Sequence, residues 1–391
     1  MRSHRLTLYG LACAGTLLLA ACGGGGGYGG GGGAVVPTAG TAAGMGMGMG
    51  MGTVPAGGFV ATNLVSDLPA ANGPYGNANV DAHLVDAWGV AFNPNGFAWV
   101  TNKGTSTSTL YDGNGAAQSL VVSIPPGSAG SAMPTGIVFN GHQDFMVTQN
   151  GKSGASPFLF VGQGGTLSGW SPGVEPTQAV TVADGGAAGT AYTGLAIASQ
   201  GASDFLFAAD FRHATIDVFD SNFGKVVGSA GRFSDPAIPS GYAPFGVQAI
   251  GDLIYVSYAR QDAQALNPLA GAGFGAIDVF DTAGRLVRRV VAPGGSVNAP
   301  WGMALAPAGF GPFGNALLVA NSGDGTIAAF NPVTGGFMGM LSTSDGSPIM
   351  IDGLHGIAFG NGLDNQSTSA LFFAAGPGGG AHGLYGRIDV R

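Results

Sequence analysis

The sequence is poor in charged side chains. Lysine, arginine, aspartate and glutamate make up 9% of its 391 residues, against roughly a quarter in an ordinary soluble domain. Glutamate occurs once, at Glu175, and lysine three times, at Lys103, Lys152 and Lys225. Long exposed helices need such residues for their polar face, so the composition argues against a helical protein.

Basic residues are few and scattered. Thirteen lysines and arginines against 21 aspartates and glutamates give a formal net charge of −8, and no segment concentrates the positive side chains. Nucleic-acid binding requires a basic patch that neutralises phosphates. We therefore expect no nucleic acid among the partners.

Cysteine is almost absent. Cys13 and Cys22 both lie in residues 1–22, where Arg2 and Arg5 precede an apolar run that ends in small residues. This layout is typical of a secretory signal peptide. Because Cys13 would leave with the signal, the mature chain could form no internal disulfide despite an oxidising destination.

The end of this segment, LAAC at 19–22, resembles the lipobox of bacterial lipoproteins, whose cysteine becomes the lipidated first residue of the mature chain. The resemblance implies a lipid anchor on Cys22, and Gly23 after the cysteine favours the outer membrane. We expect a cell-envelope protein, anchored there or secreted. An ordinary cleaved signal and an uncleaved anchor are the alternatives.

Glycine, in contrast, is abundant, with 75 residues. Residues 23–57 are nearly half glycine and contain too few apolar side chains to offset the entropy of ordering, which predicts a disordered tether. Met45, Met47, Met49 and Met51 alternate there with glycine. Thioethers are ligands that suit Cu(I), so metal capture is an alternative to a plain linker.

One short motif recurs six times. A glycine flanked by an aromatic or small residue is followed by apolar residues. The copies are AWGVAF, PTGIVF, YTGLAI, PFGVQAI, PWGMAL and LHGIAF, with glycines at 89, 136, 194, 246, 302 and 356. Their mean spacing of about 53 residues falls among the periods typical of propellers and solenoids.

Each repeat holds further strand-like runs. Second runs occupy 97–102, 144–150, 205–210, 253–259, 316–321 and 370–375. Third runs, most of them ending in polar-glycine turns typical of hairpins, are STLYDGNG, TLSGWSPG, TIDVFDSNFG, AIDVFDTAG, TIAAFNPVTG and GRIDV. Fourth runs are QSLVVSI, QAVTVA, GKVVG and RLVRRVV. Four strands in each of six repeats predict an all-β, six-bladed β-propeller over residues 58–391.

The two ends of this region complement each other. The sixth repeat stops after its third run at Arg391, and an extra strand-like run at 58–67 precedes the first motif. We expect this N-terminal strand to close the last blade, because closure removes the exposed edges of an open sheet. The closed domain is expected to be monomeric.

The motif glycines require their own explanation, since glycine weakens strands. The innermost strands of all blades converge on one axis, where a residue needs a small side chain or unusual dihedrals. The bulky residues before the glycines, Trp88, Phe245 and Trp301, are expected to pack between blades.

Segments such as PWGMALAP, ALLVANSGDGTIAAFNPVTG and IDVFDTAGRLV resemble NHL-repeat propellers. The resemblance is closer to a bacterial secreted family of NHL-like propellers that has no assigned activity, and it covers residues 59–391. The segment 63–115 is the most similar part. The resemblance implies a fold far better than a function.

Polar residues gather on one predicted face, where the innermost strands begin and the second strands end. They are His83, Asp86, Asn102, Lys103, Gln149, Asn150, Asp210, Arg212, His213, Tyr258, Arg260, Asn321, Asp324 and His355. The insertions at 151–165, 260–275 and 376–386 are expected there too. Function usually lies on loops of a rigid scaffold, although asparagine and aspartate after a strand also act simply as turn formers.

Two enzymatic alternatives follow. Six-bladed lactonases resemble this fold and hold a divalent cation in the axial channel with a glutamate, asparagines and an aspartate, but Glu175 lies in the outer part of the second repeat. His83, His355 and Asp86 would meet once the ring closes and could bind zinc or transfer protons, although no metal-binding spacing supports them.

These observations predict a lipid-anchored propeller that binds a protein or a polar, anionic ligand through its axial face. The expected ligand-binding residues are Asp210, Arg212, Arg260, Asn321, Asn102, His83 and His355. The planar fork of arginine suits carboxylate and phosphate groups. The alternative is a metal-dependent, lactonase-like hydrolase in the axial channel, and a purely structural surface protein is a third class.

Overall fold

The computed structural model describes residues 58–77, 79–227 and 232–391. The predictions for the signal peptide, Cys22 and the tether lie outside these residues. The chain divides into the units Met1–Gly52 and Thr53–Arg391, and the described residues all belong to the second unit.

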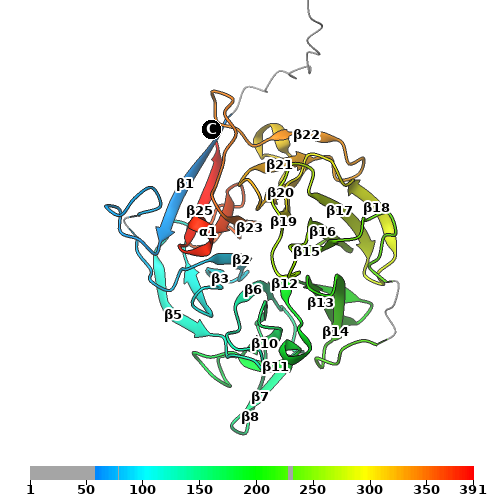
Figure 1. Cartoon of the computed structure of the whole chain (residues 1–391). Coiled ribbons are helices and arrows are strands. Elements are labelled where there is room, and N and C mark those ends of the chain that lie inside the picture. Colours follow the sequence, from blue (N-terminus) through cyan, green and yellow to red (C-terminus); the bar gives the residue numbers. More distant parts are fainter. Residues whose placement is uncertain (1–57, 78, 228–231) are drawn as a thin grey trace, which may run out of the picture. The chain divides into compact units, whose positions relative to one another are not determined.

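Six antiparallel sheets form this unit and stand around a central axis as the blades of a propeller (Figure 1). The first two blades are β2 (Ala87–Phe92), β3 (Ala98–Asn102), β4 (Thr107–Tyr111) and β5 (Ala117–Ser123), then β6 (Pro134–Phe139), β9 (Phe158–Gly162), β10 (Thr166–Trp170) and β11 (Val180–Asp184). The third and fourth are β12 (Tyr192–Gln200), β13 (Ser203–Asp210) and β14 (Thr215–Asp220), then β15 (Tyr242–Ile250), β16 (Leu253–Arg260), β17 (Gly275–Asp281) and β18 (Leu286–Val291).

The remaining two blades complete the ring. The fifth is β19 (Pro300–Leu305), β20 (Leu317–Asn321), β21 (Ile327–Phe330) and β22 (Phe337–Met340). The sixth is β23 (Leu354–Phe359), β24 (Leu371–Ala375), β25 (Leu384–Val390) and β1 (Phe59–Ser66). The helical turns are η1 (Gly186–Ala188), η2 (Gly311–Phe313) and α1 (Pro377–Gly380). Across the described ranges no helix is long and apolar enough to cross a membrane.

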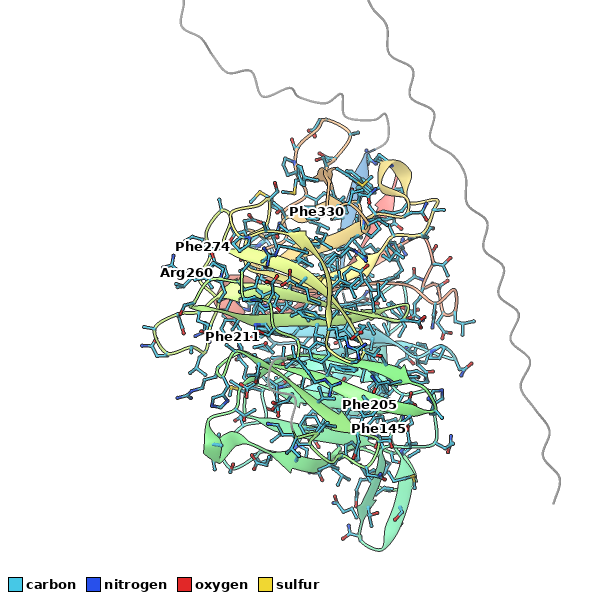
Figure 2. All side chains as sticks on the ribbon, turned by 90° about the vertical axis from the view of Figure 1, so that its right-hand side faces the viewer. Phe145, Phe205, Phe211, Arg260, Phe274 and Phe330 are labelled. Atoms are coloured by element: carbon cyan, nitrogen blue, oxygen red, sulfur yellow. The ribbon has the colours of Figure 1, made fainter. Side chains whose placement is uncertain are left out.

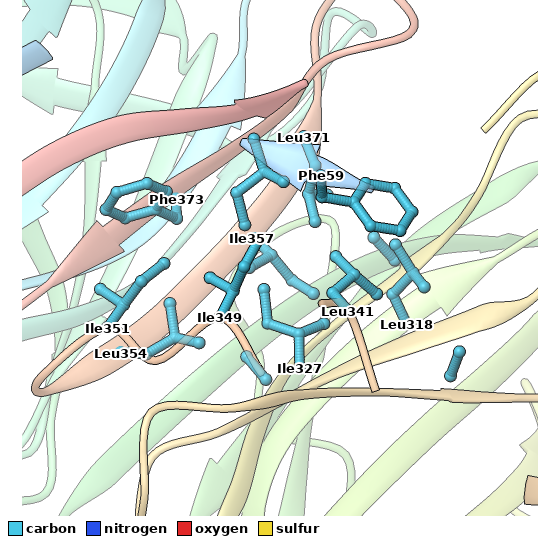
Figure 3. Close-up of a cluster of buried hydrophobic side chains, with 14 of the residues drawn as sticks. Phe59, Leu318, Ile327, Leu341, Ile349, Ile351, Leu354, Ile357, Leu371 and Phe373 are labelled. Atoms are coloured by element: carbon cyan, nitrogen blue, oxygen red, sulfur yellow. The ribbon is translucent and has the colours of Figure 1, made fainter. Parts of the chain in front are cut away.

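The N-terminal strand closes the last blade, as the sequence predicts. β1 pairs antiparallel with β25, from Phe59 opposite Val390 to Ser66 opposite Leu384. Phe59 is 2% exposed and packs among side chains of the fifth and sixth blades (Figure 3). The first strand therefore contributes core as well as backbone pairing.

The hydrophobic core is divided among the blade interfaces. One cluster of buried side chains lies between each pair of neighbouring blades, and a smaller one lies at the axis. The cluster in Figure 3 joins Leu318 and Ile327 of the fifth blade to Leu371 and Phe373 of the sixth. Each sheet thus buries both faces, which explains why its strands read as apolar runs.

The motif glycines let the innermost strands touch around the axis. A Cβ atom on Gly302 would lie 2.4 Å from the carbonyl oxygen of His355 in the next blade. For the glycines at 89, 136, 194, 246 and 356, the nearest backbone atom of the next blade would lie at 2.7, 2.6, 3.1, 2.1 and 2.3 Å. None of the six has a positive φ. Steric crowding, one of the two predicted reasons, therefore explains them.

The second blade differs from the prediction. Residues 144–150 do not form its second strand; β7 (Met146–Gln149) pairs only with β8 (Lys152–Ala155) in a hairpin that projects outward (Figure 1). The second strand is β9 instead. Gln149 and Asn150 consequently lie in this outer hairpin and not near the axis.

The third blade also differs. The run GKVVG does not extend into a fourth strand; Lys225 makes one isolated bridge to Phe219, and the sheet contains β12, β13 and β14. Lys225 bonds through its ammonium to Asp217 at 2.7 Å. Its side chain therefore forms an ion pair with the outer strand of this blade, β14.

Candidate functional site

The propeller unit has two axial faces. We call the side where the innermost strands begin the start face, and the side where they end the end face. Figure 2 shows Arg260, Phe274 and Phe211 toward the start face and Phe205 and Phe145 toward the end face. The predicted ligand-binding residues belong to the start face.

An aromatic plug, which we define as Trp88, Phe245, Trp301 and His355, fills the axis at the start face. The Trp88 ring lies 5.9 Å from that of Phe245 and 5.7 Å from that of Trp301, both edge to face, and stacks on His355 at 3.9 Å. These rings belong to the first, fourth, fifth and sixth blades. The prediction that the bulky motif residues pack between blades is therefore wrong, because they meet one another across the axis.

Polar contacts hold the plug in place. The Trp301 indole N–H donates to the carbonyl oxygen of Thr193 at 2.7 Å, and the Trp88 indole N–H donates to Asp86 at 2.9 Å. Burial lowers the pKa of His355 to about 4. The ring is therefore neutral at pH 7, as its stacking on Trp88 inside the protein requires. The start face is thus closed at its centre.

The end face, in contrast, is hollow at the axis. A cavity of about 430 Å³ opens there between the last residues of the innermost strands. Its lining is Val90, Ala91, Phe92, Ile137, Val138, Phe139, Ala196, Ile197, Gln248, Ala249, Ile250, Met303, Ala304, Leu305, Ile357, Ala358 and Phe359. Gln248 is the only polar side chain among them. We call this space the axial cavity.

The axial cavity is blind. It continues inward to a narrower space of about 30 Å³ that the motif glycines surround and that reaches Trp301 of the plug. Gln248 lines both parts. Each innermost strand pairs with its second strand alone, so its other edge presents backbone N–H and C=O groups to the axis. Apolar side chains and backbone dipoles together form the wall.

Three of the predicted site residues form hydrogen bonds within the turns that connect the strands. Asn102 and Asn321, 0% and 1% exposed, donate through their amides to Thr107 and Thr326 at 3.1 and 3.0 Å. Asp210, 2% exposed, accepts from the Ala191 and His213 backbone N–H groups and pairs with the His213 ring. These residues act as turn formers, the alternative already open from the sequence.

The two arginines of the predicted site are exposed but face different neighbours. Arg212 lies over Gly189, whose Cβ would be 3.5 Å from the guanidinium carbon, and Arg260 stacks on Phe274 at 4.8 Å. Neither makes an ion pair with a residue in the described part of the chain. Anion binding by each remains a prediction, with no contact that joins them into one clamp.

The suggested histidine site is not assembled. His83 is exposed and pairs with Asp81 at 3.0 Å, whereas His355 is buried in the plug and Asp86 binds Trp88 and Lys103. No group of three histidine, cysteine, aspartate or glutamate side chains in the described ranges could hold a metal ion. Glu175 accepts from Asn150 of the outer hairpin. The lactonase ligand pattern therefore does not fit the axial channel.

No model of a known protein family matches the chain. An uncharacterized protein of Acanthamoeba polyphaga mimivirus is 35% identical over 319 residues, which are 80% of this chain and 76% of that protein. This chain belongs to the same family. The family is thus shown through a viral relative and not through the bacterial proteins that the sequence resembles.

Solved structures share the propeller fold with this member of the family. A structural genomics protein of unknown function from Bacteroides thetaiotaomicron superposes with a TM-score of 0.51 at 9% identity, over 86% of this chain and 76% of that one. A virginiamycin B lyase from Staphylococcus aureus gives 0.45 at 13% identity, over 85% and 99%. At such identities a likeness reports fold and carries no activity.

The structure also reveals a buried ionic cluster that the sequence does not predict. Arg289 bonds both Asp235 and Asp278, and the second oxygen of Asp278 is buried without a partner. Burial, reinforced by the charge of Asp235, raises the pKa of Asp278 to about 7. The pocket of about 600 Å³ beside it, between the third and fourth blades, includes Asp235 and Tyr258. Arg289 lies opposite Asp278 on the neighbouring strand β18, whereas Asp235 comes from a distant segment before β15, which a local pattern does not indicate.

Proposed function

We propose that this protein is a binding module that takes the apolar part of a small organic ligand into the axial cavity at its end face. The observation that supports this is a blind cavity with apolar side chains and a single amide, Gln248. Concave, mostly apolar pockets of roughly 300–1,000 Å³ with few polar groups are the usual form of small-molecule sites.

The physical basis is burial of apolar surface. Each 100 Å² of apolar ligand surface removed from water contributes roughly 2.5 kcal/mol before the costs of association. Gln248 and the exposed strand edges would bind one or two polar groups of the ligand and fix its orientation. Because six rigid blades form the wall, the cavity needs little rearrangement to accept a ligand.

The cell-envelope setting belongs to the same proposal. The lipobox-like LAAC at 19–22 supports a lipid-anchored protein held through Cys22, and the resemblance of the repeats to a bacterial secreted family of NHL-like propellers supports an extracytoplasmic domain. A ligand-binding domain on a lipid anchor would sample small molecules at the envelope.

The test uses the neutral fluorescent probe N-phenyl-1-naphthylamine. We expect saturable binding with one site per chain and energy transfer from Trp301, which lies at the inner end of the cavity. Gln248→Trp should fill the cavity from an exposed position and abolish binding. Gln248→Ala should retain it.

Val333→Trp is the matched control, because it adds the same ring at a side chain that is 73% exposed on an outer turn. Its probe binding should equal that of the parent. Absence of saturable binding by the parent, or undiminished binding by a folded Gln248→Trp variant, would refute the proposed site.

A further inference from the structure

We infer that the axial cavity selects organic cations, that is, apolar molecules with a positively charged group. This inference rests on the proposed function, since it concerns the same cavity. It follows from the charges around the mouth of the cavity, which are strongly biased in sign.

The mouth is bordered by the six connections from first to second strands. They are residues 93–97, 140–157, 201–202, 251–252, 306–316 and 360–370, all of which the structure describes. Their acidic side chains are Asp144, Asp252 and Asp364, and Asp204 follows at the start of β13. Their basic side chains are His142 and Lys152, and Lys152 belongs to the hairpin that projects away from the axis (Figure 1).

One of these aspartates, Asp252, is uncompensated at the mouth. It follows the cavity-lining Ile250 by two residues and is exposed, and its side chain makes no hydrogen bond or ion pair with residues in the described ranges. Asp364 lies farther out, because its carbonyl oxygen accepts from the Gly113 backbone N–H at 2.8 Å in the turn between β4 and β5, where Arg387 also donates to the Gly113 carbonyl oxygen. The negative charge of Asp252 therefore acts on whatever approaches the mouth.

The remaining charges near the mouth form one group. The His142 ring bonds Asp204, whose other oxygen accepts from Ser199 at 2.5 Å, and Asp144 lies beside them. The hydrogen bond to Asp204 raises the pKa of His142. With His142 protonated, the two aspartates still leave this group at −1. Within the six connections no basic side chain bonds Asp252.

The expected effect is modest and depends on salt. In water a unit charge about 10 Å from a bound cation changes its affinity roughly twofold. The Debye length is about 30 Å at 0.01 M salt and about 3 Å at 1 M, so the preference should reach this size only in dilute buffer and vanish in concentrated salt. Apolar contacts with the wall supply the affinity, and the carboxylates supply the choice of sign.

Tetraphenylphosphonium and tetraphenylborate test this directly, because they share shape and apolar surface and differ in charge. Each is used to displace N-phenyl-1-naphthylamine from the full chain in 10 mM and 1 M NaCl. We expect the phosphonium to displace the probe at several-fold lower concentration in 10 mM salt. Equal or better displacement by the borate in 10 mM salt overturns the inference.

The variant Asp252→Asn identifies the carboxylate responsible. It should weaken phosphonium binding about twofold in 10 mM NaCl and leave it unchanged in 1 M NaCl, since one charge is removed. Asp364→Asn is the matched control, because it makes the same change in net charge at an exposed aspartate that lies against the outer turn at Gly113. It should bind like the parent. An equal loss in both variants overturns the local effect.

These outcomes separate the two proposals. If the neutral probe does not bind, the proposed cavity function fails and takes the cation preference with it. If the probe binds but the two tetraphenyl ions compete equally in dilute buffer, the cavity function stands and the cation preference is wrong.

Discussion

Gly302→Ala should destabilise the propeller although it adds only one methyl group. The new Cβ would lie 2.4 Å from the His355 carbonyl oxygen, 3.0 Å from the Ile357 amide nitrogen and 3.2 Å from an Ile357 side-chain carbon. Because two of these atoms are backbone of the neighbouring blade, no rotamer change relieves the contact, and the blades must separate locally. Overpacking of this kind costs about 1–3 kcal/mol.

The matched control is Gly309→Ala. A Cβ atom there meets nothing within 4 Å, and this glycine has no positive φ. Its stability should stay within about 0.5 kcal/mol of the parent or rise slightly, because alanine restricts the unfolded chain. Urea unfolding followed by tryptophan fluorescence gives both free energies of unfolding.

The ring supplies an internal ranking as well. Gly246→Ala, with its Cβ 2.1 Å from the Trp301 carbonyl oxygen, should cost more than Gly194→Ala, whose nearest neighbour is the Val247 amide at 3.1 Å. Equal stability of the Gly302→Ala and Gly309→Ala proteins would show that the blades yield without cost. The steric explanation of the repeated glycine would then be wrong.

Three further predictions concern closure, pH and anchoring. Deleting 59–66 should abolish cooperative melting, because it removes the β1–β25 pairing and takes Phe59 out of the core. Deleting 23–57 should leave the melting temperature unchanged. Similar melting curves for both variants would contradict the closure of the ring by β1. The pKa of His355, about 4, lies below its ordinary 6.5, so its contribution to the free energy of unfolding should be fully present above pH 6.5 and fall toward pH 4, by on the order of 3 kcal/mol. His355→Phe should remove this dependence of stability on pH. An unchanged dependence in urea titrations of the variant would exclude His355 as its source. Cys22→Ser should move the folded protein from the membrane to the soluble fraction, and unchanged fractionation would rule out the lipid anchor.

Much of the fold could be predicted from the sequence, because two local features mark each repeat. The glycine motif and the apolar runs recur with every blade, and the strand at Phe59–Ser66 stands where the last repeat lacks one. Local patterns of this kind determine how many blades form and in what order. They need no knowledge of which residues meet in space.

The second blade shows where local pattern fails. Phe145 and Val147 are 0% and 1% exposed, and Val147 packs so closely on β10 that a Cβ on Gly169 would lie 2.8 Å from it. An outer hairpin that buries one face therefore has the same apolar pattern as a blade strand. Only its tertiary position distinguishes it from β9.

The candidate site was less predictable for a related reason. Trp88 of the first blade meets Phe245 and Trp301 of the fourth and fifth blades only across the closed ring, so nothing in their spacing indicates that they plug one end of the axis. Asn102 and Asn321 carry polar groups in the predicted place, but their side-chain N–H groups donate to neighbouring threonines. The hollow end of the axis is lined by apolar residues that look like ordinary strand interiors in the sequence.

The pairing of β1 with β25 also determines when the ring can close during synthesis of the chain. Phe59–Ser66 is synthesised before the other strands that the structure describes, and its partner Leu384–Val390 after all of them. At about 5–20 residues per second, the ribosome needs roughly 15–60 s to reach that partner. During this interval β1 lacks its partner strand, and bringing the two together across so long a segment costs about 5 kcal/mol of loop-closure entropy. The ring can therefore close only after β25 has been made, when the other five blades are already available to hold the two strands close.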